Sequence, residues 1–497
     1  MNKPGGFFSL FDLPATRFDA DALQRLAKAM DSGAILGVSS CDSGYVYLGQ
    51  FITHDITKRG TLPAGKFVPA SQLVQQRTPA LDLDNVYGDG FDDAQIAVDK
   101  GSGKMLLGTV YDSSNKPGSD DDLPRERLKA RARIGDERDD ENLLVAQLHV
   151  QFLKLHNLFV DRIVEQMPGL KPWQYFDEAR RNLILCYQDV ILYDYLRAVL
   201  DEEVWQRVIR NKQVTLWPAN RTASMPIEFA AAAFRFGHAM VRPSYAINRL
   251  TSANGDDLFR MTGQSAKAFD GRRGLPDTHI VDWRMFFSGL SGREEPPFSN
   301  RAAFIDPTVG LTVDLPQRPG ASGPGNSQEL IAALDLRAGN FSMLPDAQAI
   351  VAHLEGKYPA LSLELLHEEQ LNPKDLLHEL RGDGGRHEYL GLTKQTPLFY
   401  YVLCEAHARK NGSGRWLGRL GSLIVAETLR ALIDLSSPSV LHKRDKVLDD
   451  LGVEATGEEI DGRPHFKMID LLKPIGPQGR TGVAPADDRQ PPFRHVA

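Results

Sequence analysis

Apolar residues recur at steps of three and four positions along several stretches of this chain, which is the period of an amphipathic α-helix. The longest stretch begins near Asp136, and its apolar stripe consists of Leu144, Leu148, Phe152, Leu155, Phe159 and Ile163. Shorter stretches with this period predict helices at 21–31, 174–199, 226–241, 328–335, 346–355, 373–380, 396–409 and 415–435. No well-patterned series of strands and no internal repeat interrupts them, so the sequence predicts a mainly α fold with little β.

Segments rich in Gly, Pro, Asp and Ser separate these helices, and those at 61–128 and 306–328 are expected to be long loops. Nothing in the sequence has the composition of an interdomain linker, so one large domain is predicted despite the length of the chain. We expect an N-terminal arm, 1–40, packed on a domain at 41–472. An extended C-terminal tail is expected at 473–497.

The 497 residues are 42% hydrophobic and 25% charged, which is ordinary for a globular protein with a large core. The formal net charge is −7 and the basic residues are scattered, so nucleic acid is not expected as a partner. No apolar run has the pattern of a signal peptide or the length of a transmembrane segment. We therefore expect a soluble protein that is cytoplasmic or leaves the cell by a non-classical route.

The segment GQFITHD places Gln50 one helical turn before His54 and sets Asp55 directly after that histidine. If the segment is helical, Gln50 and His54 can face the same space. A lone histidine among apolar residues is more often a hydrogen-bonded core residue than a reactive group. This segment alone is therefore compatible with either role.

Two other segments carry comparable pairs of residues. Arg138 and Glu141 lie one turn apart at the expected helix start at 135–142, where they could reach a cavity or form a solvated ion pair. In AAAAFRFGHAMV the alanines make a helix surface thin enough for a flat, bulky group, and His238 projects from it with Arg235 one turn earlier. The alternative for this helix is tight packing on another helix, with a satisfied histidine.

Five segments, taken in order, resemble the animal-type haem peroxidases of the peroxidase-cyclooxygenase superfamily, and most closely its bacterial members. They are LGQFITHD, RTPALDLDNVYGDG, IGDERDDENLLVAQLHVQFLKLHN, FRFGHAMVRPSY and TPLFYYVLCEAHARKNGSGRWLGRLGSLIVAETL. Together they span most of residues 45–435. The resemblance implies a single large haem-peroxidase domain, haem b as its cofactor, and hydrogen peroxide and a small reducing molecule as its substrates.

The same resemblance assigns roles to individual residues. His238 matches the axial iron ligand, which a neutral imidazole suits, and Arg235 is expected beside the cofactor. His54 matches the distal histidine, which takes a proton from peroxide and returns it to the leaving oxygen. Arg138 matches the distal arginine, whose charge stabilises the negative charge that develops as the oxygen–oxygen bond breaks. Gln50 matches a distal glutamine that hydrogen-bonds water and helps to shape a halide site.

In this family the residue after the distal histidine is a calcium ligand, which gives Asp55 a role. The other ligands come from a loop before a VYG sequence, and the matching loop here offers Thr78, the carbonyl of Ala80, Asp82 and Asp84. This is an all-oxygen set rich in carboxylate, as Ca²⁺ requires, and the ion would steady the segment that carries the distal histidine. The alternative is an Asp-rich turn that faces water.

Some family members bind haem covalently through two esters and a sulfonium link. Glu141 stands at one ester position, but Thr53 occupies the other, where an aspartate is needed. Asn142 stands where the methionine of the sulfonium link would be. At most one ester, through Glu141, is therefore expected.

The family also has an asparagine that hydrogen-bonds the axial histidine, and the segment ALDLRAGNFSMLPDAQ aligns to it in two ways. One alignment puts Asn340 at that position, and the other puts Asp335 there. A carboxylate would give His238 more imidazolate character and lower the reduction potential of the iron. Both alignments stay open.

Three functions fit the resemblance. The first is a peroxidase, in which peroxide oxidises haem to a ferryl intermediate that small organic donors, halide or thiocyanate then reduce. The second is a haem-dependent fatty-acid dioxygenase, and the third is a non-catalytic haem-binding protein of the same fold. Related oxygenases carry a tyrosine three residues before the axial histidine, and Arg235 stands there, which favours the peroxidase. His149 and His156, seven residues apart on the long helix, are expected to be structural.

Overall fold

The computed structural model describes residues 6–31, 37–60, 66–114, 116–126, 131–213, 216–218, 223–254, 257–258, 261–262, 274–291, 300–310, 312–315, 327–371, 392–408, 414–442 and 451–476. The helix predicted at 373–380 lies outside these residues. So does most of the C-terminal tail predicted at 473–497.

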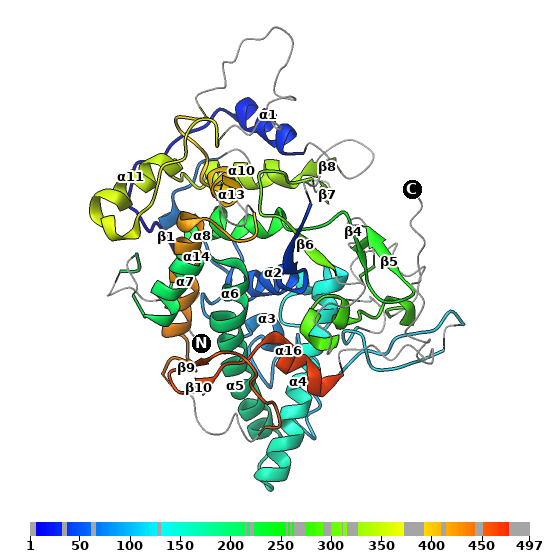
Figure 1. Ribbon diagram of the computed structural model, residues 1–497. Helices are drawn as coiled ribbons and strands as arrows, with labels where there is room; N and C mark the ends of the chain where they lie inside the picture. The colour runs from blue at the N-terminus through cyan, green and yellow to red at the C-terminus, as the bar shows by residue number, and fades with distance from the viewer. Residues whose placement is uncertain are drawn as a thin grey trace.

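Helices build most of the protein, and α2, Gly44–Ile56, lies near the middle of it (Figure 1). The other α-helices are α1 (Ala20–Met30), α3 (Asp84–Tyr87), α4 (Leu143–Gln166), α5 (Pro172–Val190), α6 (Leu196–Val199), α7 (Glu202–Trp205), α8 (Ile227–Ala231), α10 (Ile331–Phe341), α11 (Ala347–Lys357), α13 (Leu398–Ala408), α14 (Arg419–Leu435) and α16 (Met468–Leu472). The prediction of a mainly α fold is confirmed.

The strands are short, and the sheets in the described ranges have two strands each. One sheet is parallel, and the others are antiparallel. The pairs are β1 (Phe7–Phe8) with β3 (Met225–Pro226), β2 (Val38–Asp42) with β6 (Arg301–Ala303), β4 (Ser244–Ala246) with β5 (Ser252–Asn254), β7 (Thr312–Leu315) with β8 (Ser327–Leu330), and β9 (Glu459–Ile460) with β10 (Arg463–Pro464).

Aromatic rings join α2, α4 and α5 in the core. Phe51 of α2 stacks on Phe152 of α4 with ring centroids 4.6 Å apart, and Tyr187 of α5 lies edge-on to both rings. All three side chains are fully buried. Each such pair adds about 0.5–1.5 kcal/mol beyond the area it buries, so the cluster holds α2 firmly against the long helix.

The long helix α4 begins later than predicted. Residues Glu137–Asp140 form a separate 3₁₀ turn, which Asp136 caps by accepting a hydrogen bond from the backbone N–H of Arg138. Asn142 then caps α4 by accepting from the N–H of Leu144 at 2.9 Å. Because these side chains satisfy the backbone groups of two separate starts, the predicted single helix start at 135–142 is wrong.

The helix predicted at 226–241 is broken at Ala232, where φ is −144° and ψ is −74°. The chain continues as a 3₁₀ turn, Ala233–His238. Alanine favours a helix, so a tertiary contact overrides the local preference here. The Nε–H of Arg235 donates to the carbonyl of Ala230 at 3.1 Å and satisfies one of the acceptors at the end of α8.

Other predicted elements differ in smaller ways. The helix predicted at 174–199 contains a π-turn, Ile191–Tyr195, between α5 and α6. The helix predicted at 328–335 starts only at Ile331, because the residues before it belong to β8. The loop predicted at 306–328 contains β7. The remaining described helices lie within a few residues of their predicted bounds, which is the usual uncertainty of helix ends.

The first residues of the chain are fastened to segments far along the sequence. The hydroxyl of Ser9 and the N–H of Leu10 donate to the carboxylate of Glu228, which is fully buried beneath them. The amide of Asn340 accepts from the N–H of Phe18 and donates to its carbonyl, both at 3.0 Å. The N-terminal arm therefore lies against α8 and α10.

One described helix, α4, is long and apolar enough to cross a membrane by length and composition. In this protein 83% of its most apolar window is buried by other parts of the chain. Helices buried in a protein core can have the same length and apolar composition. The apolar composition of α4 is therefore accounted for by its burial in the core.

Candidate functional site

His54 of α2 and His238 of the 3₁₀ turn Ala233–His238 line the same cavity, of about 190 Å³. A second cavity, of about 260 Å³, shares four of its lining residues, which are Thr53, Phe234, Arg235 and His238. The two spaces are therefore neighbours. Together they are in the range of pockets that hold small ligands or cofactors.

The turn that carries His238 explains how one carboxylate serves two residues. A 3₁₀ turn has three residues per turn, so the side chains of Arg235 and His238 lie directly above one another. Both reach Asp335 of α10: Nη1 of Arg235 lies 2.6 Å from Oδ1, and Nδ1 of His238 lies 2.6 Å from Oδ2. Asp335 is fully buried, whereas 39% of the His238 side chain is exposed to the cavity.

The two residues considered as partners of His238 are thus in different places. Asp335 contacts the imidazole, while the amide of Asn340, on the same helix, holds the backbone of Phe18. Because a carboxylate accepts, Nδ1 of His238 carries the proton and Nε2 keeps its lone pair for the cavity.

His54 is held in the same way, through the Nδ1 of its ring. Its Nδ1 lies 2.7 Å from Oδ1 of Asp139, which is completely buried. The second oxygen of Asp139 contacts Nδ1 of His149 at 2.7 Å and the amide of Asn85 at 2.9 Å. Asp139 therefore fixes the Nδ1–H tautomer of His54 and leaves its Nε2 to face the cavity.

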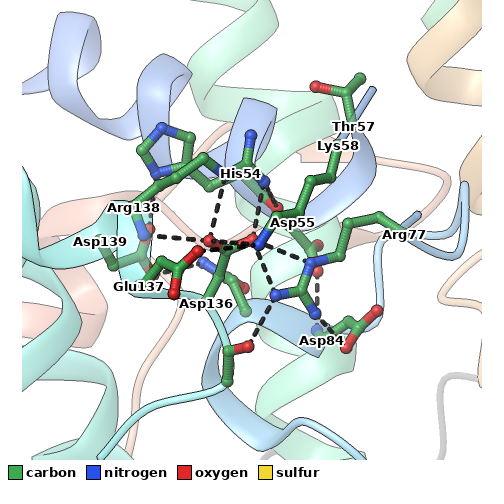
Figure 2. A network of polar contacts seen from close by, with 12 residues as sticks. His54, Asp55, Thr57, Lys58, Arg77, Asp84, Asp136, Glu137, Arg138 and Asp139 are labelled. Atoms are coloured by element: carbon green, nitrogen blue, oxygen red, sulfur yellow. Dashed lines mark hydrogen bonds and ion pairs between the residues drawn. The ribbon is translucent and has the colours of Figure 1, made fainter. Parts of the chain in front are cut away.

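Figure 2 shows that Arg138 belongs to a network of charged groups beside His54. Its Nη2 donates to the carbonyl of His54 at 2.9 Å and to Asp136 at 2.8 Å. Arg77 donates to the same Asp136 carboxylate at 2.7 Å, and Lys58 lies 3.7 Å from it. Arg138 lines the second cavity, so its charge is fixed at the edge of the site.

The electrostatics of Asp136 follow from these contacts. Burial alone would raise the pKa of this carboxyl, which is 1% exposed. The hydrogen bonds and charge of Arg138, together with the charge of Arg77, outweigh burial and hold the pKa of Asp136 below its ordinary value. The carboxylate stays ionised and keeps both guanidinium groups in place.

The remaining candidates near the cofactor differ in their positions. Gln50, Thr53 and Asn142 line the cavity with His54. Glu141 is exposed to solvent and lines neither cavity, so its ester link remains a prediction. Gly49 allows α2 to pack closely against Tyr195, because a Cβ at this position would lie 2.6 Å from the hydroxyl oxygen of Tyr195.

Carboxylates gather where calcium was predicted. The N–H of Asp84 donates to Oδ1 of Asp55 at 2.8 Å, while Oδ2 of Asp55 and Oδ1 of Asp82 are buried without a hydrogen-bond partner. Burial and the charge of Asp84 raise the pKa of Asp82 to about 7. Burial and the charges of Asp82 and Asp84 also raise the pKa of Asp55 well above its ordinary value.

These oxygens are gathered but do not form a finished ligand shell. In the described part of the chain, no three acidic, histidine or cysteine side chains are arranged as metal ligands. Asp84 is also engaged by Arg77, with Nη1 of the arginine 2.8 Å away. The N–H of Ala80 donates to the carbonyl of Thr78 at 2.8 Å, so this loop is folded as a tight turn beside the carboxylates. Unpartnered buried carboxylate oxygens of this kind suit a hard cation.

Sequence reasoning missed Asp136 and Asp139. Both lie in the acidic run DERDD, at the start of the long helix that the apolar period predicts, where acidic residues suit the helix dipole. A useful signal was available, because four acidic residues that flank one arginine before a hydrophobic helix are more than a helix dipole requires. Nothing in the sequence indicated that His149 would meet Asp139.

The chemistry of the cavity fits haem. Two imidazoles from different segments present Nε2 to one space, and each has its Nδ1 occupied by a buried carboxylate. Much of the surrounding wall is apolar or aromatic, with Tyr47, Phe234, Phe236, Met240 and Ile331 among its residues. A flat apolar macrocycle with a central metal suits such a space.

The fold is shared with a solved peroxidase and with solved fatty acid alpha-dioxygenases. The structure of peroxidase A from Dictyostelium discoideum matches with a TM-score of 0.60 and 15% identity, over 95% of this chain and 93% of that one. A fatty acid alpha-dioxygenase from Arabidopsis thaliana matches with a TM-score of 0.63 and 12% identity, over 94% and 77%. At such low identities these matches establish the shared fold alone.

Residues 50–270 match the sequence model of the family described as Animal haem peroxidase. The relatives include a peroxidase named mlt-7 from Caenorhabditis elegans, 26% identical over 40% of this chain and 28% of its own length. Another is the dual oxidase of Drosophila melanogaster, 31% identical over 33% of this chain and 10% of its own length. The chain thus matches only a minor part of these relatives.

Proposed function

We propose that this protein is a haem peroxidase that reduces hydrogen peroxide and oxidises small organic donors, halide or thiocyanate. The observation that carries the proposal is the pair of histidines on one cavity, each with Nδ1 held by a carboxylate and Nε2 free. The match of residues 50–270 to the animal haem peroxidases supports it. The peroxidase A fold of Dictyostelium discoideum agrees with it.

In this proposal His238 would hold the haem iron, because its Nε2 keeps a lone pair and its side chain is open to the cavity. When bound, haem supplies the iron that binds peroxide and accepts its oxidising equivalents. Nε2 of His54 takes a proton from the proximal oxygen of peroxide and gives it to the departing oxygen. Arg138 contributes fixed positive charge as that oxygen leaves, and Gln50 orients water or a halide beside His54.

The proposed calcium ion would use Asp55, Asp82 and Asp84 with oxygens of Thr78 and Ala80. Its effect would be to neutralise the gathered carboxylates and to join this loop to α2, directly beside His54. The supporting observation is the pair of buried carboxylate oxygens without partners on Asp55 and Asp82. An ester through Glu141 is a further proposal, and acidified solvent that extracts all haem would rule it out.

Fatty-acid oxygenation is the second candidate, because Tyr47, Phe234 and Phe236 give the cavity an apolar wall that could hold an acyl chain. Against it, Arg235 stands where such enzymes carry a tyrosine. Arginine has no phenol that could form a hydrogen-abstracting radical, and the guanidinium of Arg235 is held by Asp335. The peroxidase is therefore preferred.

The test is stopped-flow absorbance of the haem-loaded protein mixed with hydrogen peroxide, followed by a phenol and, separately, by bromide. A fast change of the haem spectrum that a donor reverses is the expected result. Loss of that change in the variant His54→Ala, with haem retained, would tie it to the proposed base. A protein that loads haem, ignores peroxide and consumes oxygen with a fatty acid would overturn the peroxidase in favour of the oxygenase.

A further inference from the structure

Asp139 is the carboxylate of the site that contacts two histidines. It comes from the 3₁₀ turn Glu137–Asp140, where α2 and α4 pack together, and it is fully buried. One oxygen accepts from His54, and the other accepts from His149 and from the amide of Asn85. A single carboxylate thus links the cavity histidine to a second histidine in the core.

The protons in this cluster can be placed from its hydrogen bonds. An ionised carboxylate only accepts, so His54 and His149 each carry a proton on Nδ1. Burial would raise the pKa of Asp139, but the hydrogen bonds from both histidines hold it below its ordinary value. The cluster is therefore one carboxylate that accepts hydrogen bonds from two imidazoles.

The two imidazoles are not equivalent. Nε2 of His54 faces the cavity, whereas Nε2 of His149 is buried without a hydrogen-bond partner among the described residues. The ring of His149 also meets Phe51 edge-on, with centroids 6.0 Å apart, which places it in the aromatic core. His149 therefore has one polar task in this arrangement, which is its contact with Asp139.

We propose that Asp139 is the positioning residue of His54, holding its Nδ1–H tautomer so that Nε2 is left for the cavity, and that His149 competes with His54 by sharing the carboxylate. The inference deepens the proposed peroxidase function, on which it rests for its catalytic meaning. Replacing Asp139 by a residue that cannot accept from both histidines should release this tautomer and slow reactions at Nε2. Removing His149 should have the opposite effect, because both carboxylate oxygens are then left to His54 and Asn85.

The experiment needs neither haem nor peroxide for its first measurement. Diethyl pyrocarbonate acylates unprotonated imidazole nitrogens, and mass spectrometry gives the rate at each histidine of the apoprotein. His238 lines the same cavity and keeps its own carboxylate, so it is an internal reference. The variant Asp139→Asn should lower the ratio of the His54 rate to the His238 rate about tenfold, because an amide cannot accept from both histidines.

The matched control is Asp140→Asn. Asp140 follows Asp139 in the same turn, is 1% exposed and pairs with Arg125 at 2.6 Å, so its loss tests the cost of removing a buried carboxylate from this turn. It should leave the His54 to His238 ratio within twofold of the parent. The variant His149→Phe should raise the ratio of the His54 rate to the His238 rate a few-fold. This variant provides the test if Asp139→Asn fails to fold.

A second measurement joins the inference to function. In the haem-loaded protein, Asp139→Asn should slow the reaction with peroxide about 10- to 100-fold, and Asp140→Asn should not. An unchanged acylation ratio in Asp139→Asn, or an equal fall in Asp140→Asn, would overturn the inference. A shifted ratio in an apoprotein whose haem form ignores peroxide would instead uphold the positioning role and reject the peroxidase.

Discussion

The two sides of the cavity hold their histidines by the same device but with different charge. On the His238 side, Asp335 is shared with Arg235, whose guanidinium lies 2.6 Å from one carboxylate oxygen. On the His54 side, Asp139 is shared with a second imidazole and an amide, and the described contacts include no arginine or lysine at that carboxylate.

This difference matters because a carboxylate strengthens a histidine only as far as its charge is left uncompensated. Arg235 neutralises much of the charge of Asp335, so His238 receives less electron density than the carboxylate alone would give. Asp139 keeps its charge, so His54 receives more. In the proposed peroxidase, one arrangement of a histidine and a carboxylate would hold the iron ligand on one side and the base on the other.

Replacing each histidine separately by alanine should have the largest effects and should distinguish the two sides of the cavity most clearly. His238→Ala should abolish tight haem binding, because it removes the strong axial ligand, whereas His54→Ala should retain haem. His54→Ala should slow the peroxide reaction about 10²- to 10⁴-fold, the usual contribution of a general base. Haem titration followed by absorbance, and then stopped flow, measure both effects. Equal haem affinity in the two variants would contradict the assignment of sides.

The charged network around Asp136 tests whether the His54 side depends on a fixed arginine. Asp136→Asn removes the partner of Arg77 and Arg138 and should lower the free energy of unfolding by about 3–5 kcal/mol. The depressed pKa of Asp136 stabilises the fold above its ordinary value of 3.8, and this stabilisation is lost as pH falls below that value. Denaturant unfolding from pH 7 to 3 should show a smaller loss with falling pH in the variant. An identical pH dependence would argue against the network.

Asp335 and Asn340 offer a matched pair on one helix. Asp335→Asn should weaken haem binding about 10- to 100-fold and raise the reduction potential, because a neutral amide oxygen replaces the charged acceptor of His238. Asn340→Ala should leave the potential unchanged and instead free the arm at Phe18, which limited proteolysis would detect. A shift of potential in Asn340→Ala alone would reverse these roles.

Calcium removal should give the smallest effect. If the ion binds between Asp55 and Asp82, free calcium at ten times its dissociation constant adds about 1.4 kcal/mol to the free energy of unfolding. A chelator should remove this gain in the parent protein and make the rate of its reaction with peroxide less uniform. The chelator should change neither property in the variant Asp82→Asn. Thermal unfolding that is identical with calcium and with chelator would contradict the site.

Much of this picture was available from the sequence. The period of three and four residues identified α4 because a long buried stripe can only be helical, and the spacing in GQFITHD placed Gln50 and His54 on one face of α2. Both histidines were expected to share a cavity, and they do. The presence of Asp335 beside His238 was one of two open alternatives.

What could not be predicted depends on contacts between distant segments. The Ala-rich helix broke because Arg235 and His238 both reach a carboxylate about 100 positions away, and helical propensity does not register such a partner. Asp139 lies among other acidic residues at an expected helix start, so the sequence does not distinguish it from its neighbours. It is buried only because α2 brings His54 to it across 85 positions. Side-chain caps, likewise, divided one apparent helix start into two.

The N-terminal arm imposes an order of assembly on the growing chain. Thr16 hydrogen-bonds Asp346, 330 positions away, while the contacts of Asp139 are complete once His149 has been made. A ribosome adds about 5–20 residues per second, so the His54 side can close some 10–40 s, roughly, before the arm finds its partners. A cofactor that needs both histidines can therefore bind only after the second half of the chain has been made and has packed against the first.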